Sequence, residues 1–286
     1  MKFKKVDLSF QSCTADYPES KVVIFSSPMD ATTSFRPGTR LAGNAIRVDS
    51  IGIEWYSPYQ DMNLKTVKTC DIGDLDLPIG DVEKSLKVIK DTTTQILKDN
   101  KKPMMIGGEH LVSLPVVEAL HKKYPDLHII HFDAHTDLRD EFFGRKLSHA
   151  TVMRRIFDIL GKGRIFQFGI RSGDASEFKW ADAGNITMRR FDLVGVENVV
   201  KKIKNKPVYI TIDIDVLDPA TVPGTGTPEP GGVTYRELIE AILKLRELKN
   251  IVGADIVELA PNLDPSGAST AAAVKTLREM VLLLHK

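Results

Sequence analysis

The sequence predicts an α/β protein of three layers, in which helices cover both faces of a mostly parallel central sheet. Short apolar runs rich in β-branched residues alternate with longer segments in which apolar residues recur with a helical period. No internal repeat, low-complexity tract or Pro/Gly/Ser-rich linker interrupts this alternation. We therefore expect residues 1–286 to form a single domain.

Six apolar runs account for the expected strands. They contain few polar residues, which is typical of strands that are buried on both faces of a parallel sheet. The runs cover residues 21–25, 103–108, 127–133, 163–169, 207–215 and 250–259. Such a sheet needs helices on both sides, and the segments between the runs must supply them.

Five helices are expected between and after these strands. Residues 81–100 carry a one-sided apolar stripe, which indicates an amphipathic helix. Thr234 and Glu237 form a capping-box pattern, so a helix is expected to begin there and to run to about residue 248. The remaining three candidates cover residues 111–124, 150–160 and 270–285.

Composition excludes several classes of protein. The chain has 39 Lys and Arg residues against 38 Asp and Glu residues, so its net charge of +1 argues against a general affinity for nucleic acid. With 42% hydrophobic residues the chain is not disordered, and no apolar run approaches the length of about 18 residues that a membrane helix needs. Cys13 and Cys70 cannot build a disulfide scaffold. We expect a cytoplasmic protein that binds neither nucleic acid nor membranes.

Ionisable residues follow four of the six expected strands. In a parallel sheet, functional residues gather in the loops beyond the carboxyl ends of the strands, so these side chains are candidates for a common site. They are Glu109 and His110 after the second run, Asp133, His135 and Asp137 after the third, Asp213 and Asp215 after the fifth, and Glu258 at the end of the sixth.

The spacing of these residues indicates a metal centre. Side chains two positions apart in an extended chain point the same way, so Asp133, His135 and Asp137 converge, and Asp213 and Asp215 repeat the pattern. Four carboxylates placed together cannot all stay ionised without a cation, and two divalent ions would balance their charge. Imidazole and carboxylate ligands without thiolate favour Mn²⁺. An Asp-x-Asp pair alone is more often structural; the larger set makes chance a poor explanation.

Longer motifs around these residues resemble those of a known family. HFDAHTD (131–137), TIDIDVLDPATVPGTGTPEPGG (211–232) and GADIVELAPNLD (253–264) are similar to the signatures of the ureohydrolases, the family of arginases and agmatinases. GGEH (107–110) stands where the family more often has Gly-Gly-Asp-His, and residues 26–47 resemble an agmatinase N-terminal segment. The resemblance covers nearly the whole chain and implies an arginase-like fold.

The resemblance also implies a ligand set for two metal ions, expected to be Mn²⁺. One ion would be held by His110, Asp133, Asp137 and Asp213, and the other by Asp133, His135, Asp213 and Asp215. A hydroxide that bridges the two ions would be the nucleophile. The cluster would then carry a net negative charge, which suits a cationic substrate.

Three residues receive catalytic or substrate-binding roles from the same resemblance. Glu258 would bind the guanidinium group of the substrate, because a carboxylate can accept two parallel N–H bonds from that planar cation. His149 would pass a proton to the departing amine, and Asp137 would relay a proton as well. Glu109 replaces the more frequent Asp beside the metal histidine, and we expect it to support the metal ligands from behind. Asp218 is expected to order its loop, and His131 to be structural or to support the ligands.

The loop at residues 138–149 favours agmatine over arginine. It lacks the Asn, Ser and Thr set with which arginases bind the amino acid end of their substrate, and Asp140 and Glu141 would repel a carboxylate, although Arg139 and Arg145 weaken this argument. Phe142, Phe143 or Trp180 could flank the alkyl chain, although a core role is as plausible for each. The expected products are urea and putrescine.

Other interpretations stay open. A related enzyme could act on guanidinobutyrate, arginine or another guanidine, and a protein of this fold could bind metal without catalysis. A binuclear phosphatase would need positive groups for phosphate, whereas Glu258 has the opposite sign. By resemblance we expect a homo-oligomer, a trimer or a hexamer.

Overall fold

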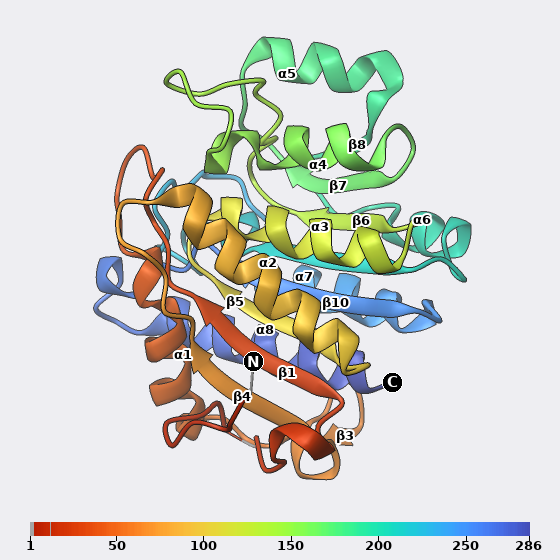
Figure 1. Cartoon of the computed structure of the whole chain (residues 1–286). Helices are drawn as coiled ribbons and strands as arrows, with labels where there is room; N and C mark the ends of the chain where they lie inside the picture. Colours follow the sequence, from red (N-terminus) through yellow and green to blue (C-terminus); the bar gives the residue numbers. More distant parts are fainter. Residues whose placement is uncertain (1–2, 12) are drawn as a thin grey trace.

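A computed structural model describes residues 3–11 and 13–286 and contains a central sheet of eight strands (Figure 1). Every pair of neighbouring strands in this sheet is parallel. The strands lie in the order β4 (Thr69–Asp74), β1 (Val22–Ser27), β5 (Lys102–Gly107), β10 (Ile251–Val257), β9 (Val208–Asp213), β6 (His128–Phe132), β7 (Ile165–Ile170) and β8 (Thr187–Arg190). The expected α/β fold with a parallel sheet is confirmed.

Helices cover both faces of the sheet, and each face has its own apolar core (Figure 1). On one face lie α2 (Val82–Lys98), α3 (Ser113–Lys123) and α4 (Val152–Leu160). On the other lie α1 (Ala42–Asp49), α6 (Val196–Lys202), α7 (Tyr235–Lys244) and α8 (Ala268–His285). The short α5 (Ala175–Trp180) precedes β8 near one end of the sheet.

The six predicted strands correspond to β1, β5, β6, β7, β9 and β10, and in all but β5 every residue is buried. The five predicted helices correspond to α2, α3, α4, α7 and α8. Helix α7 begins as expected, because the Thr234 backbone N–H donates to the Glu237 carboxylate at 2.7 Å and the Glu237 N–H donates to the Thr234 hydroxyl at 3.3 Å. It ends at Lys244, before the predicted end, and a 3₁₀ turn (Leu245–Glu247) completes the segment.

The two edge strands β4 and β8 and the helices α1, α5 and α6 were not predicted from the sequence. Neither was a small hairpin formed by β2 (Tyr56–Ser57) and β3 (Met62–Asn63). For the function, the order of the four middle strands matters most. Strands β5, β10, β9 and β6 are consecutive in the sheet, so the ionisable residues that follow them emerge side by side. In the described part of the chain, no helix is both long and apolar enough to cross a membrane.

Candidate metal centre and substrate cavity

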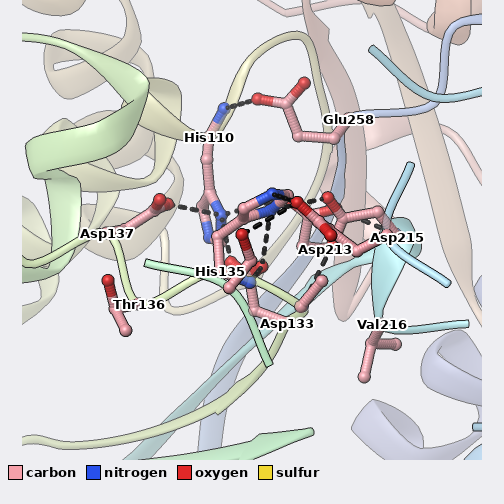
Figure 2. A network of polar contacts seen from close by, with 12 residues as sticks. His110, Asp133, His135, Thr136, Asp137, Asp213, Asp215, Val216 and Glu258 are labelled. Carbon is pink, nitrogen blue, oxygen red and sulfur yellow. Dashed lines mark hydrogen bonds and ion pairs between the residues drawn. The ribbon is translucent and has the colours of Figure 1, made fainter. Parts of the chain in front are cut away.

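His110 lies at the centre of a group of carboxylates (Figure 2). It begins the 3₁₀ turn (His110–Val112) that follows β5. Its Nδ1 atom lies 3.1 Å from Asp133 Oδ2, 3.4 Å from Asp137 Oδ2 and 3.3 Å from Asp213 Oδ2. Its other ring nitrogen, Nε2, is 2.9 Å from the Thr211 hydroxyl on β9, and this contact turns Nδ1 toward the carboxylates.

A second group adjoins the first and shares Asp133 with it (Figure 2). His135 Nδ1 lies 2.9 Å from Asp215 Oδ2 and 3.6 Å from Asp133 Oδ1. The Asp215 backbone N–H donates to Asp213 Oδ1 at 2.9 Å, and Asp215 Oδ1 accepts from the Ala134 N–H at 3.1 Å. These bonds hold the carboxylates in place, so the structure brings all six residues predicted as metal ligands into one cluster.

The electrostatics of the cluster fit divalent cations. Within residues 3–11 and 13–286, two of its buried atoms, His110 Nδ1 and Asp215 Oδ2, form no hydrogen bond, although each lies close to another ligand-type atom, Asp133 Oδ2 and His135 Nδ1 respectively. Burial, and after it the neighbouring carboxylates, raise the pKa of Asp137 and of Asp213 well above the usual range. Burial alone would lower the pKa of His110, but Asp133 and Asp213 outweigh it and raise that pKa. Excess negative charge and unused ligand atoms together make this a cluster that could hold metal ions.

The backbone is strained at two of the candidate site residues. Asp137 has φ of 53° and Glu258 has φ of 64°, a left-handed conformation that side chains other than glycine adopt rarely. Such strain costs on the order of 1–3 kcal/mol per residue and is concentrated at functional sites. In both residues the backbone turns sharply just after the strand region, and this turn places the carboxylate at the cluster.

Glu258 borders both the cluster of His and Asp residues and an adjacent cavity of about 220 Å³. Its Oε1 atom accepts a hydrogen bond from the His110 backbone N–H at 2.7 Å (Figure 2). Burial, and then the nearby Glu109 carboxylate, raise its pKa to about 8. The cavity walls also include His135, Asp137, Arg139, Phe142, His149, Glu177 and Asp213. Four of the lining residues are carboxylates and one is an arginine, so the charged groups that a cation meets in the cavity are mainly negative.

His149 faces the same cavity from the 3₁₀ turn (His149–Thr151) before α4. Its Nδ1 atom lies 3.3 Å from the Thr32 hydroxyl and its Nε2 atom 3.3 Å from the Ser34 hydroxyl. The ring of Phe142 meets it edge-on at a centroid distance of 5.7 Å. Burial, and after it the positive charge of His135, lower the pKa of His149 to about 4, so the imidazole is neutral near pH 7.

Comparison with known proteins identifies the family. The model of the arginase family matches residues 20–283. The chain belongs to the arginase family. It is 49% identical over 268 residues to an agmatinase of Bacillus cereus, covering 93% of this chain and 92% of that protein. It is 32% identical over 274 residues to a guanidinobutyrase of Pseudomonas aeruginosa, covering 90% of this chain and 84% of that protein. The solved structure of the agmatine ureohydrolase of Thermoplasma volcanium superposes on this chain with a TM-score of 0.88 at 32% identity. The match covers 99% of this chain and 95% of that one. The resemblance found in the sequence is thus confirmed.

His131 is close enough to His110 and Asp133 to form a third possible metal group in this arginase-family chain, but its hydrogen bonds argue against that role. Gln167 Nε2 donates to His131 Nδ1 at 2.9 Å, so the ring proton resides on Nε2. Nε2 in turn lies 2.7 Å from Asp133 Oδ2. Both ring nitrogens are therefore used, and His131 orients the Asp133 carboxylate from behind.

Other predicted residues have different surroundings from those expected. The Glu109 carboxylate does not support a metal ligand directly; instead it accepts hydrogen bonds from Thr32, as described below. Phe143 is 83% exposed, and Trp180 packs against Phe157 with ring centroids 4.6 Å apart, so Phe142 alone of the three aromatic candidates lines the cavity. Asp218 accepts from the backbone N–H groups of residues 220, 231 and 232 and orders its loop, as expected.

Sequence reasoning missed three polar residues that hold the site together. Thr211 orients His110, and Thr32 contacts His149. Glu229 Oε1 accepts from the Ser172 hydroxyl at 2.8 Å and lies 3.6 Å from His135 Nε2, so it supports the ring of that histidine. A weak signal existed for all three, because Thr211 and Glu229 lie inside the long motif at 211–232 and Thr32 lies inside the segment at 26–47, but nothing in the sequence sets these three residues apart from their neighbours.

Proposed function

We propose that the protein is an agmatinase, which hydrolyses the guanidinium group of agmatine to give urea and putrescine. One observation carries the proposal: the cluster of two His and four Asp residues reaches, through His135, Asp137 and Asp213, a cavity that the Glu258 carboxylate also lines. A carboxylate beside a metal-binding cluster suits a substrate whose reacting group is a planar cation. The similarity to the agmatinase of Bacillus cereus supports the same activity.

Two Mn²⁺ ions are the proposed cofactors. His110, Asp133, Asp137 and Asp213 would hold one, and Asp133, His135, Asp213 and Asp215 the other. When bound, such ions would supply the Lewis acidity that makes water a nucleophile near neutral pH. The protein contributes the fixed positions of the carboxylates, which His131 and the backbone N–H groups of residues 134 and 215 hold in place.

Glu258 and His149 act on the substrate from two sides of the cavity. Glu258 would accept two N–H bonds from the guanidinium and so fix the position and orientation of its carbon atom. The positive charge of the substrate favours the ionised form of this carboxylate. His149 would deliver a proton to the amine nitrogen that departs, since a neutral imidazole at the cavity wall can take up a proton and pass it on. Asp137 would relay a proton within the site.

The far end of the substrate distinguishes agmatine from its relatives. Phe142 offers an apolar surface for the alkyl chain, and Glu177 brings a further carboxylate to the cavity. Arg139 is the one observation that favours guanidinobutyrate, because its guanidinium would attract a carboxylate. Its charge is partly offset, since Arg139 Nε lies 3.6 Å from Glu177 Oε2. We therefore place agmatine first and guanidinobutyrate second.

The decisive experiment measures urea release from agmatine, guanidinobutyrate and arginine, after chelation and again after Mn²⁺ is restored. We expect activity only with Mn²⁺ and the highest kcat/KM with agmatine. A preference for either other guanidine would overturn the substrate assignment. The variant Asp213→Asn is expected to lose both Mn²⁺ and activity, whereas Asp182→Asn serves as a matched control because its side chain is 63% exposed and contacts Arg190 instead of the cluster. Loss of Mn²⁺ without loss of activity would refute the catalytic role of the cluster.

Three broader features belong to the proposal: a single domain over residues 1–286, which rests on the unbroken alternation of strands and helices, a cytoplasmic location, and a homotrimer or homohexamer, which rests on the family resemblance. Analytical ultracentrifugation of the Mn²⁺-loaded protein measures the third directly. A monomer at micromolar concentration would contradict it.

A further inference from the structure

We propose that Thr32, itself held by Glu109, positions His149 and sets its tautomer, so that Nδ1 carries the proton and Nε2 is the nitrogen that exchanges protons in the cavity. This inference rests on the proposed function, because it assigns a positioning residue to the histidine that would act on the substrate. It also gives a role to Glu109, the residue that departs from the family pattern.

Thr32 is hydrogen-bonded to the buried carboxylate of Glu109. The Glu109 side chain is completely buried, at 0% exposure, on the loop after β5. Its Oε2 atom accepts from the Thr32 backbone N–H at 2.7 Å, and its Oε1 atom accepts from the Thr32 hydroxyl at 2.9 Å. Both polar groups of Thr32 are thus tied to a single buried carboxylate, which fixes the direction of the Thr32 O–H bond. These contacts give the extra methylene of Glu109 a structural use.

The second step concerns the protons of Thr32 and His149. A threonine hydroxyl has one proton to donate and two lone pairs that accept. The proton goes to Glu109, and one lone pair accepts from the His149 backbone N–H at 3.0 Å. The remaining lone pair faces His149 Nδ1 at 3.3 Å. A hydrogen bond there requires a proton on Nδ1, which leaves Nε2 unprotonated in the neutral ring.

A neighbouring hydroxyl could favour the opposite tautomer. Ser148 Oγ lies 3.4 Å from His149 Nδ1, and a proton donated by Ser148 would require Nδ1 to be bare. In that case Thr32 Oγ1 and His149 Nδ1 would face each other with no proton between them. Because the proton of the Thr32 hydroxyl and one of its lone pairs are already used, the remaining lone pair favours the proton on His149 Nδ1, and a Ser148 variant separates the two cases.

The third step is the orientation of the ring. Nε2 points to Ser34, which lines the cavity together with His149, so the unprotonated nitrogen is the one that substrate can reach. Phe142 restrains the ring from the side with an interplanar angle of 88°. An imidazole held at Nδ1, with an unprotonated Nε2 that faces the Ser34 hydroxyl at the cavity wall, is prepared to take up a proton at the cavity and release it to a leaving amine.

The test replaces the Thr32 hydroxyl and reads both the tautomer and the kinetics. Thr32→Val keeps the shape of the side chain and removes the hydroxyl, whereas Thr32→Ser keeps the hydroxyl. With Mn²⁺ and agmatine, we expect Thr32→Val to lower kcat by about 10- to 100-fold, a part of the effect of a complete general acid, with a much smaller change in KM. Thr32→Ser should restore most of kcat. Thermal unfolding verifies that each variant is folded.

The tautomer is read without any turnover. ¹⁵N spectra of the metal-free protein, labelled at histidine and assigned with His149→Gln, distinguish a protonated from a bare Nδ1. We expect a protonated Nδ1 in the original protein and in Ser148→Ala, and loss of that preference in Thr32→Val. A bare Nδ1 in the original protein, or a Thr32→Val variant with unchanged tautomer and kcat, would overturn the inference. If the protein released no urea from any guanidine, the proposed function and the catalytic role of His149 would both be refuted. The spectra would still decide whether Thr32 sets the tautomer.

Discussion

The hydrogen bond between His110 Nε2 and the Thr211 hydroxyl allows a quantitative test of the metal centre. The two atoms are 2.9 Å apart, and both side chains are almost fully buried. Thr211→Val keeps a β-branched side chain of nearly the same volume in β9 but leaves the Nε2–H group without a partner, at a cost of about 1–3 kcal/mol. Loss of the outer partner of a metal-ligating histidine typically lowers metal affinity by about 10- to 100-fold, which corresponds to about 1.4–2.7 kcal/mol. The first figure is a loss of folding stability and the second a loss of metal affinity, so each can be measured by itself.

Calorimetric titration of the chelated protein with Mn²⁺ measures this effect, and Thr211→Ser is the matched control because it keeps the hydroxyl. We expect the dissociation constant of Thr211→Val to rise by about 10- to 100-fold and that of Thr211→Ser to stay close to the original. Denaturant unfolding of the metal-free variants measures the structural cost separately. A Thr211→Val protein that loses free energy of unfolding but binds Mn²⁺ as tightly as the original would refute the reasoning that His110 is a ligand oriented by Thr211.

Three further predictions concern the substrate, the pH and the backbone. Glu258→Gln should lower kcat/KM for agmatine by at least about 30-fold, since loss of one partner of a charge pair costs about 2–5 kcal/mol; an unchanged value would exclude contact with the guanidinium. In the metal-free protein, Glu258 has a pKa of about 8 and Glu109 of about 7, whereas an unfolded Glu titrates near about 4.3. Between about pH 4.3 and 8 the folded state therefore binds more protons than the unfolded state, so the unfolding temperature should fall as the pH rises through this range and level off above about pH 8; saturating Mn²⁺, or Glu109→Gln, should flatten this decline. Gly108→Ala would place a methyl carbon 1.9 Å from the Met29 backbone oxygen and should lower the free energy of unfolding, measured with denaturant, by at least about 1–3 kcal/mol. In the control Gly52→Ala the new methyl group meets no atom within 4 Å, so the free energy of unfolding should change by less than about 0.5 kcal/mol.

The strands that could be predicted from the sequence are those that the fold buries on both faces. The two strands of the central sheet that were not predicted, β4 and β8, are its edges. Strand β8 alternates exposed and half-buried residues and contains Arg189 and Arg190, and β4 contains Asp71 and Asp74, so neither forms a continuous apolar run. Charged residues are a usual feature of edge strands. The missed helices α1, α5 and α6 have 8, 6 and 7 residues, which is too short for a helical period to stand out.

The proximity of the site residues was predictable because parallel strands present their carboxyl ends at one edge. Asp133, Asp213 and Glu258 follow adjacent strands, so their meeting required only the fold class and the strand ends. The contacts of Thr32 and Ser34 with His149 were not predictable, since they join an irregular loop to a turn more than 100 positions away. The metal-binding and catalytic roles of the site residues stay predictions until the experiments above are done.

The place of β10 in the sheet determines when the site can exist during biosynthesis. Strand β10 is the last strand in the chain, yet it lies between β5 and β9 in the middle of the sheet. Before its residues leave the ribosome, His110 belongs to one half of the sheet and the four aspartates to the other, with no strand to join them. The nascent chain therefore has no complete binding cluster until about nine tenths of it has been synthesised, and insertion of this one strand joins the two halves and completes the centre in the same event.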